Sequence, residues 1–96
     1  MDVAIIGGTG EEGFGLSLRL ARAGHHVIIG SRSAEKGASR AAEAKELLGG
    51  DVAIDGTTND EAASATGFVA VTVPFAGQAD IYRAIKGAVK PGTIVL

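Results

Sequence analysis

Three glycines near the N-terminus have the spacing of a phosphate-binding turn. They follow an apolar run as Gly8-x-Gly10-x-x-Gly13, and a helical pattern follows them. In such a turn the first glycine permits a tight bend, the second lets the backbone approach a pyrophosphate, and the third lets helix and strand pack closely. The helix directs free N–H groups and the positive end of its dipole at the phosphates. We predict a dinucleotide site here; the alternative is a plain glycine turn in a chain with 15 glycines.

A second polar group follows the next apolar run, at the position where dinucleotide sites distinguish NAD from NADP. A site that prefers NAD usually has Asp or Glu about 20 residues past the glycines, where it binds the ribose 2′-hydroxyl. This chain has Gly30-Ser31-Arg32 there, with no acid. Arg32 can offer parallel N–H donors to a phosphate, Ser31 adds a hydroxyl and Lys36 adds a second positive charge. We interpret these three residues as a clamp for the 2′-phosphate of NADP; the alternative is a solvated surface turn.

The elements that position these residues follow from the hydrophobic patterns. Short apolar runs predict strands at about 3–6, 27–29, 51–54, 68–73 and 93–96. Helical periodicity and end signals predict helices at about 10–23, 34–48, 59–65 and 78–89. Ser33 is the expected N-cap of the second helix, and Asn59 or Asp60 that of the third. The alternation predicts an α/β fold, a Rossmann-like doubly wound parallel sheet with strand order 3-2-1-4-5.

This topology predicts where a ligand lies. The first and fourth strands are neighbours in such a sheet, and the helices that follow them cover opposite faces. A crevice is therefore expected between the carboxyl ends of these two strands. The turn from Gly8 to Gly13 forms one wall, and Thr72, Val73 and Pro74 form the other.

The composition excludes several other classes of protein. Ninety-six residues make one small domain, and with three Phe and one Tyr its core must consist of Ala, Val, Ile and Leu. A net charge of −2 provides no basic surface for nucleic acid. Without Cys there is no disulfide or thiolate zinc site, and we expect no metal and a cytoplasmic location. No apolar run approaches the roughly 20 residues of a membrane helix, and the early first strand leaves no room for a targeting peptide.

Four stretches together resemble the NADPH-dependent reductases of coenzyme F420, which are 5-deazaflavin-dependent oxidoreductases with a Rossmann domain. The stretches are 3–10, 18–21, 30–32 and 72–74. The resemblance covers essentially the whole chain, but only the N-terminal domain of the family. We therefore expect residues 1–96 to form an NADP-binding Rossmann domain that is truncated inside an apolar strand, with the family's C-terminal part absent. The sheet edge left there is expected to be covered by a homodimer contact or another partner.

The resemblance also implies which residues bind NADP. Residues 9–12 match those that bind the pyrophosphate, Ser31, Arg32 and Lys36 match those that bind the 2′-phosphate, and Val73 and Pro74 match those near the nicotinamide. With the fingerprint glycines, the expected cofactor-binding set is Gly8, Thr9, Gly10, Glu11, Glu12, Gly13, Ser31, Arg32, Lys36, Thr72, Val73 and Pro74.

Glu11 and Glu12 depart from the family, whose members have neutral residues at these positions. Two carboxylates beside a pyrophosphate should weaken its binding unless they point outward. At the start of a helix they also stabilise the positive end of the dipole, which is the simpler reason for acids in a first turn.

The activity implied by the resemblance is hydride transfer between NADP(H) and the deazaflavin co-substrate F420. This transfer needs no protein nucleophile because the cofactors carry the reactive atoms, so the sequence identifies no catalytic residue. Two alternatives stay open: an NADP-linked reductase of an imine, a ketoacid or a metal, and a non-enzymatic NADP-sensing domain. The pair Tyr82 and Lys86 matches that of short-chain dehydrogenases, but it precedes the fifth predicted strand, and we interpret it as chance. His25 and His26 fall in a turn opposite the crevice.

Overall fold

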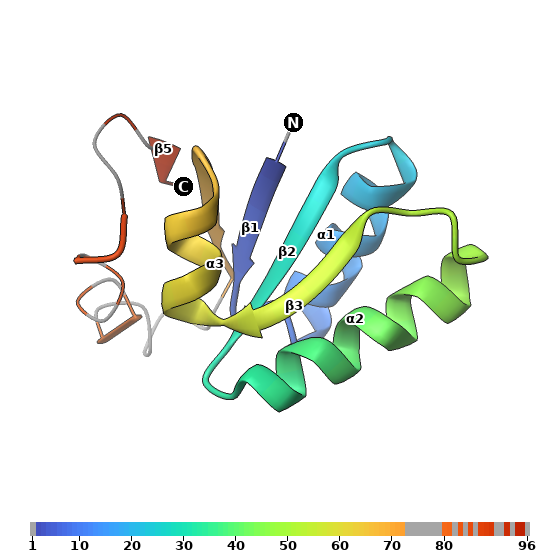
Figure 1. Cartoon of the computed structure of the whole chain (residues 1–96), viewed down its shortest axis with the longest axis horizontal. Coiled ribbons are helices and arrows are strands. Elements are labelled where there is room, and N and C mark those ends of the chain that lie inside the picture. The colour runs from blue at the N-terminus through green and yellow to red at the C-terminus, as the bar shows by residue number, and fades with distance from the viewer. Residues whose placement is uncertain are drawn as a thin grey trace.

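A parallel sheet organises the protein, as the alternation of strand and helix patterns predicts. The computed structural model describes residues 2–72 and, beyond them, residues 80, 81, 83, 85, 87–89, 92, 94 and 95. The strand order is β3-β2-β1-β4-β5, and every pairing is parallel (Figure 1). Both the predicted fold class and the predicted strand order are confirmed. The elements are β1 Asp2–Ile6, α1 Glu11–Arg22, β2 His26–Ser31, α2 Ala34–Leu48, β3 Ile54–Thr58, α3 Asn59–Ala65, β4 Phe68–Val71 and β5 Ile94–Val95.

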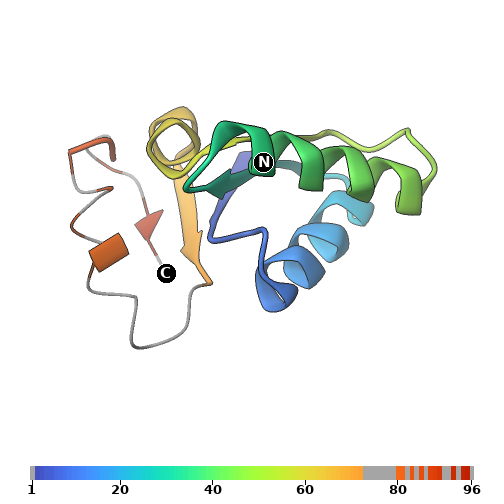
Figure 2. The same cartoon turned by 90° about the horizontal axis from the view of Figure 1, so that it is seen from below.

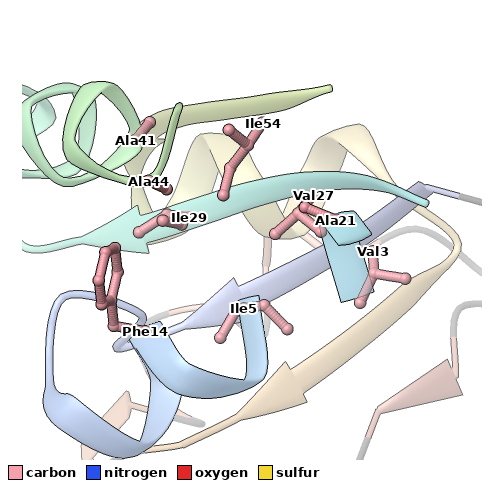
Figure 3. Packing of buried hydrophobic residues seen from close by; sticks show 9 residues of the cluster. All are labelled: Val3, Ile5, Phe14, Ala21, Val27, Ile29, Ala41, Ala44 and Ile54. Carbon is pink, nitrogen blue, oxygen red and sulfur yellow. The ribbon is translucent and has the colours of Figure 1, made fainter. Parts of the chain in front are cut away.

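Alternate residues of β1 divide the core into two clusters, one on each face of the sheet. Val3 and Ile5 pack on the face covered by α1 and α2, whereas Ala4 and Ile6 pack on the face covered by α3 (Figures 1 and 2). This is the period-two alternation of a strand that is buried on both sides. The first cluster comprises Val3, Ile5, Phe14, Ala21, Val27, Ile29, Ala41, Ala44 and Ile54 (Figure 3). Among the described residues, no helix is long and apolar enough to cross a membrane.

The helix α2 lies against β3 with no side chain between the two backbones. A Cβ atom on Gly37 of α2 would come within 2.6 Å of the Thr57 carbonyl oxygen, and one on Gly56 would overlap the Gly37 carbonyl. Both positions therefore require glycine for space, although neither has a positive φ. This contact brings the first turns of α2 close to the carboxyl edge of the sheet.

The third strand is three residues later than its apolar run predicts. The sequence indicates 51–54, whereas β3 is Ile54–Thr58 and pairs along β2 from Val27 to Ser31. Only Ile54 of this edge strand is buried, and the polar residues that follow it resemble a turn in sequence. Their backbone pairing with β2 and the close contact at Gly56 outweigh their low strand propensity.

The ends of the other helices and strands differ less from their predicted positions. Ser33 caps α2 as predicted, but α3 is capped by Thr58, and neither Asn59 nor Asp60 is the N-cap. The strand β2 continues through Ser31, so this residue ends a strand instead of lying in a turn. Val73, Pro74, Tyr82 and Lys86 lie outside the described residues.

The predicted helix at 78–89 ends earlier than expected. Its described residues Asp80, Ile81, Arg83 and Ile85 are helical, whereas 87–89 form a turn and a bend. Ile81 and Ile85 are buried in the second cluster, which also includes Ala62 and Ala63 of α3.

His26 joins the amino ends of three strands, at the edge of the sheet opposite the glycine turn. Its Nε2 lies 2.8 Å from Oδ2 of Asp55 on β3, and its Nδ1 lies 3.3 Å from Oδ1 of Asp2 on β1. The hydrogen bond to Asp55 is the main reason that the pKa of His26 is raised above 6.5; Asp2 adds to the effect and partial burial opposes it.

This arrangement predicts a pH dependence of stability. Because the pKa of His26 is raised on folding, its contribution is complete below the unfolded pKa of about 6.5 and is lost as the pH rises through the folded pKa. The free energy of unfolding, measured with urea at pH 5.5 and pH 8.5, should decrease more with rising pH in the unmodified protein than in His26→Gln. Equal decreases in both proteins would contradict the prediction.

Candidate dinucleotide site

The turn after β1 has its unusual backbone conformation at Gly7, one residue before the fingerprint. Gly7 has a φ of 76°, and none of the three fingerprint glycines has a positive φ. The residue with a positive φ in this turn is therefore Gly7, which the fingerprint spacing does not include, and glycine adopts this φ without strain. The N–H groups of Gly7 and Gly8 each donate to the Gly30 carbonyl at 3.1 Å, which ties the turn to the end of β2.

Two of the fingerprint glycines are needed because there is no room for a side chain. A Cβ on Gly8 would lie 2.9 Å from both the Ile5 carbonyl oxygen and a methyl carbon of Ile29. A Cβ on Gly13 would overlap the Thr72 hydroxyl and lie 2.8 Å from the Cα of Gly8. These contacts agree with the predicted role of Gly13 in close packing between helix and strand.

Gly10 differs from the other two because its surroundings in the protein leave room for a Cβ. The nearest atom to such a Cβ is the Gly7 carbonyl oxygen at 3.6 Å, an ordinary contact, and Gly10 is exposed. Nothing in the described part of the protein therefore requires glycine at this position. A requirement would have to come from a ligand that approaches the backbone, which is the role of the second glycine in a dinucleotide fingerprint.

The start of α1 is the only N-terminus among the three labelled helices without a side-chain cap. Gly10 is its N-cap and makes no such bond, whereas Ser33 and Thr58 accept from the backbone N–H groups of Lys36 and Glu61. The first N–H groups of α1 are thus left for an external acceptor. Glu11 and Glu12 are exposed in this first turn, where their charges also favour the helix dipole.

The structure brings the fingerprint turn and the predicted clamp together around one hollow of about 220 Å³. It lies at the carboxyl ends of β1 and β2, next to the first turn of α2. The residues lining it are Gly7, Thr9, Ser31, Arg32, Lys36, Asn59 and Ile81. A second hollow of about 410 Å³ shares Ser31, Arg32 and Asn59 and extends past Thr58 and Asp60.

The smaller hollow carries positive charge. Arg32 and Lys36 are exposed, and neither has an ion-pair partner among the described residues. No acid is among the described residues that line it. Ser31 is 5% exposed, and its Oγ accepts from the Ser33 N–H at 3.3 Å, so its own hydroxyl hydrogen stays free to donate elsewhere. The hollow thus combines two cations and a hydroxyl donor.

Asn59 belongs to the same group, although sequence reasoning assigned it only as a helix cap. It is 8% exposed, and its Oδ1 accepts from the Gly7 N–H at 3.3 Å. This bond fixes the orientation of the amide, because only the oxygen can accept. The Nδ2 group has no acceptor within the described part of the chain and belongs to a residue that lines both hollows. In the sequence, the only feature that could have indicated a role for Asn59 in the site is its position directly after the third strand.

Thr72, which the sequence predicts to form the wall opposite the glycine turn, follows directly after β4. Its N–H and its hydroxyl both donate to the Ile6 carbonyl, at 3.0 and 2.8 Å, which fixes the end of β4 to the end of β1. With Gly10, Glu11 and Glu12 it lines a third hollow of about 350 Å³. The predicted site residues Val73 and Pro74 lie outside the described part of the chain.

A five-stranded parallel sheet with a glycine turn after its first strand defines the Rossmann type of dinucleotide-binding domain. An (S)-3-hydroxybutyryl-CoA dehydrogenase from Ralstonia eutropha has the same fold, with a TM-score of 0.75 over 98% of this chain and 39% of its own. A protein from Lactobacillus casei matches with a TM-score of 0.60 over 99% of this chain and 46% of its own. At 22% identity, both support the fold alone.

A family model described as NADP oxidoreductase, coenzyme F420-dependent, matches residues 2–96, and the chain belongs to this family. It is 42% identical over 96 residues to a protein of Methanothermobacter thermautotrophicus named F420-dependent NADP reductase, covering 99% of this chain and 41% of the relative. A protein of the same name from Methanocaldococcus jannaschii is 40% identical over 99 residues, covering 100% of this chain and 44% of the relative. The chain therefore spans less than half the length of these curated relatives.

The close packing at Gly13 predicts opposite effects of two alanine substitutions on α1. Gly13→Ala should lower the free energy of unfolding by about 1–3 kcal/mol, because the added methyl group meets Thr72 and the turn. Gly15→Ala is the matched control: a Cβ there meets nothing within 4 Å. It should raise the free energy of unfolding by about 0.5–1 kcal/mol through helix propensity. Urea unfolding of both variants measures this, and equal effects would refute the packing argument.

Proposed function

We propose that this protein binds NADP(H) in preference to NAD(H). We further propose that residues 1–96 form the NADP-binding part of an oxidoreductase that transfers hydride between NADP(H) and the 5-deazaflavin coenzyme F420. The observation that carries the first proposal is the hollow where the glycine turn meets Arg32 and Lys36, two cations without ion-pair partners among the described residues.

The turn fits the pyrophosphate that NAD and NADP share. The uncapped N-terminus of α1 offers N–H donors, and Gly10 leaves space for close approach. These are backbone features, so they do not distinguish the two dinucleotides. The nearby Glu11 and Glu12 reduce the attraction, because their charges lie in the same first turn.

The clamp fits the 2′-phosphate, which only NADP has. An acid at the end of β2 would accept a hydrogen bond from the 2′-hydroxyl of NAD and would repel a phosphate. Here the strand ends in Ser31, which is followed by Arg32. Arg32 supplies a planar donor pair, Lys36 a point charge and Ser31 a hydroxyl. The acceptor-only phosphate oxygens match this set of donors.

Support for F420 as the second substrate comes from family membership. Bound NADP and F420 would themselves supply the hydride donor and acceptor. The task of the protein is then to hold the two rings in contact. We propose that the nicotinamide lies near the third hollow, which is lined by Thr72 and the start of α1. The part of the relatives that this chain does not match is the proposed location of the remaining deazaflavin contacts.

Titration with NADPH and with NADH tests the binding proposal. NADPH should bind more tightly than NADH. Arg32→Ala should reduce NADPH affinity by about 10- to 150-fold, which corresponds to a charge-assisted contact of about 1.5–3 kcal/mol, while NADH affinity changes little. Lys45→Ala is the control, because Lys45 is an exposed cation in the last turn of α2 and lines neither of the two hollows that Arg32 lines. Equal affinity for the two dinucleotides, or an equal loss in the control, would reject the clamp.

The proposed activity has a separate test. Residues 1–96 with NADPH and oxidised F420 should bind NADPH but reduce the deazaflavin slowly, measured as loss of its visible absorbance, because the second ring is held only partly. Joining the remaining length of a curated relative should restore turnover. Fast turnover by residues 1–96 alone would contradict the proposal that the remaining deazaflavin contacts lie outside this chain. Reduction of other acceptors in preference to F420 would favour a different NADP-linked reductase.

A further inference from the structure

We propose that Arg40 is a positioning residue that fixes the phosphate-binding turn from the neighbouring helix. This proposal rests on the proposed function, because the turn matters only if it binds a dinucleotide. Arg40 lies on α2, outside the fingerprint and outside the predicted clamp. Its Nε–H donates to the Thr9 carbonyl at 3.2 Å, across 31 residues of sequence.

The other faces of the Arg40 guanidinium are also engaged within the protein. Nη1 donates to Oε2 of Glu43 at 2.7 Å. The central carbon of the group lies 3.7 Å from the centroid of the Phe14 ring. Phe14 is itself 8% exposed in the first core cluster, at the start of α1 (Figure 3). The side chain of Arg40 is 25% exposed, so most of it is fixed between α1, α2 and the turn.

We therefore infer that Arg40 does not bind the ligand through its charge. Glu43 neutralises it at close range, and the ring covers one face. Arg32 and Lys36, by contrast, have no such partner among the described residues and line the hollow directly. On this basis we assign ligand binding to Arg32 and Lys36, and we assign to Arg40 the role of holding the turn in position.

The bond to Thr9 determines the orientation of one peptide group. The Thr9 carbonyl and the Gly10 N–H belong to the same planar unit and point in opposite directions. Arg40 holds the oxygen, and the Gly10 N–H donates to the Gly7 carbonyl at 3.2 Å. With both ends held, this peptide cannot rotate, and it leads directly into the first N–H groups of α1. Without Arg40, only the backbone bond from Gly10 to Gly7 resists rotation.

The same helix then sets the distance between two parts of the ligand. Lys36 and Arg40 are four residues apart on α2 and so lie on neighbouring turns of one face. Through Lys36 the helix presents a cation to the proposed 2′-phosphate position, and through Arg40 it holds the proposed pyrophosphate turn. In the proposed complex, α2 therefore determines the positions of both the 2′-phosphate and the pyrophosphate.

Two substitutions separate positioning from charge. Arg40→Met keeps an unbranched apolar stem over Phe14 but has no donor, whereas Arg40→Lys keeps the charge but loses the Nε–H. Both should weaken NADPH and NADH by the same factor, about three- to tenfold for one hydrogen bond, and leave the ratio of the two affinities unchanged. Glu43→Gln is the control, which keeps the bond to Thr9 and should change both affinities by less than about twofold.

A measurement without ligand tests the contact itself. Amide hydrogen exchange at Gly10 should be faster in both Arg40 variants, while exchange at Ile29 in the centre of β2 stays as in the unmodified protein, because the opening is local. Exchange at Gly10 that is unchanged in Arg40→Met would overturn the proposal. A merely structural loss of stability would accelerate Ile29 as well, and would also overturn it.

The remaining outcomes are equally decisive. Full affinity in Arg40→Lys would show that charge alone matters, and a loss confined to NADPH would show direct contact with the 2′-phosphate; either result rejects positioning. If the unmodified protein binds neither dinucleotide, the proposed function fails. Gly10 exchange then still decides whether Arg40 holds the turn.

Discussion

The geometry of the candidate site depends on two places where backbones meet with no side chain between them. Gly37 of α2 lies against the backbone of Gly56 and Thr57 of β3, and Gly13 of α1 lies against the backbone of Gly7 and Gly8. Helices usually pack on sheets through side chains, so contacts of this kind bring a helix unusually close to the strands. Both contacts lie at the carboxyl edge of the sheet. They carry the starts of α1 and α2 toward the same hollow.

Hydrogen bonds from both backbone and side chains then fix the ends of the strands relative to one another. Thr72 donates twice to the Ile6 carbonyl and so joins β4 to β1. Asn59 accepts from Gly7 and so joins α3 to the turn, and Gly7 and Gly8 donate to the Gly30 carbonyl of β2. Each of these bonds satisfies a backbone group that the end of a strand leaves without a ladder partner. The turn is therefore held from both β2 and α3 before any ligand is present.

The fold and part of the site could be predicted because they depend on local patterns. Continuous apolar runs revealed β1, β2 and β4, and the Ser33 cap revealed the start of α2. The third strand was placed wrongly because it is a polar edge strand held by pairing and by the contact at Gly56. Gly7 was missed for a related reason: the spacing of a fingerprint says nothing about which residue has the positive φ. Arg40 and Asn59 act across 31 and 52 residues of sequence, and no local pattern records such contacts.

The cations of α2 show why charge has to be judged in three dimensions. In sequence, Lys36 and Arg40 are two basic residues one helical turn apart, and either could face a phosphate. In the structure, Arg40 is bound to Glu43 and stacked on Phe14, whereas Lys36 lies exposed at the hollow without an ion partner among the described residues. In the proposed complex, discrimination between NADP and NAD would rest on exposed charges that salt screens. The affinity common to both would rest on a turn whose shape is fixed by short-range bonds, which salt affects far less. The two properties can therefore change independently, because different residues of one helix supply them.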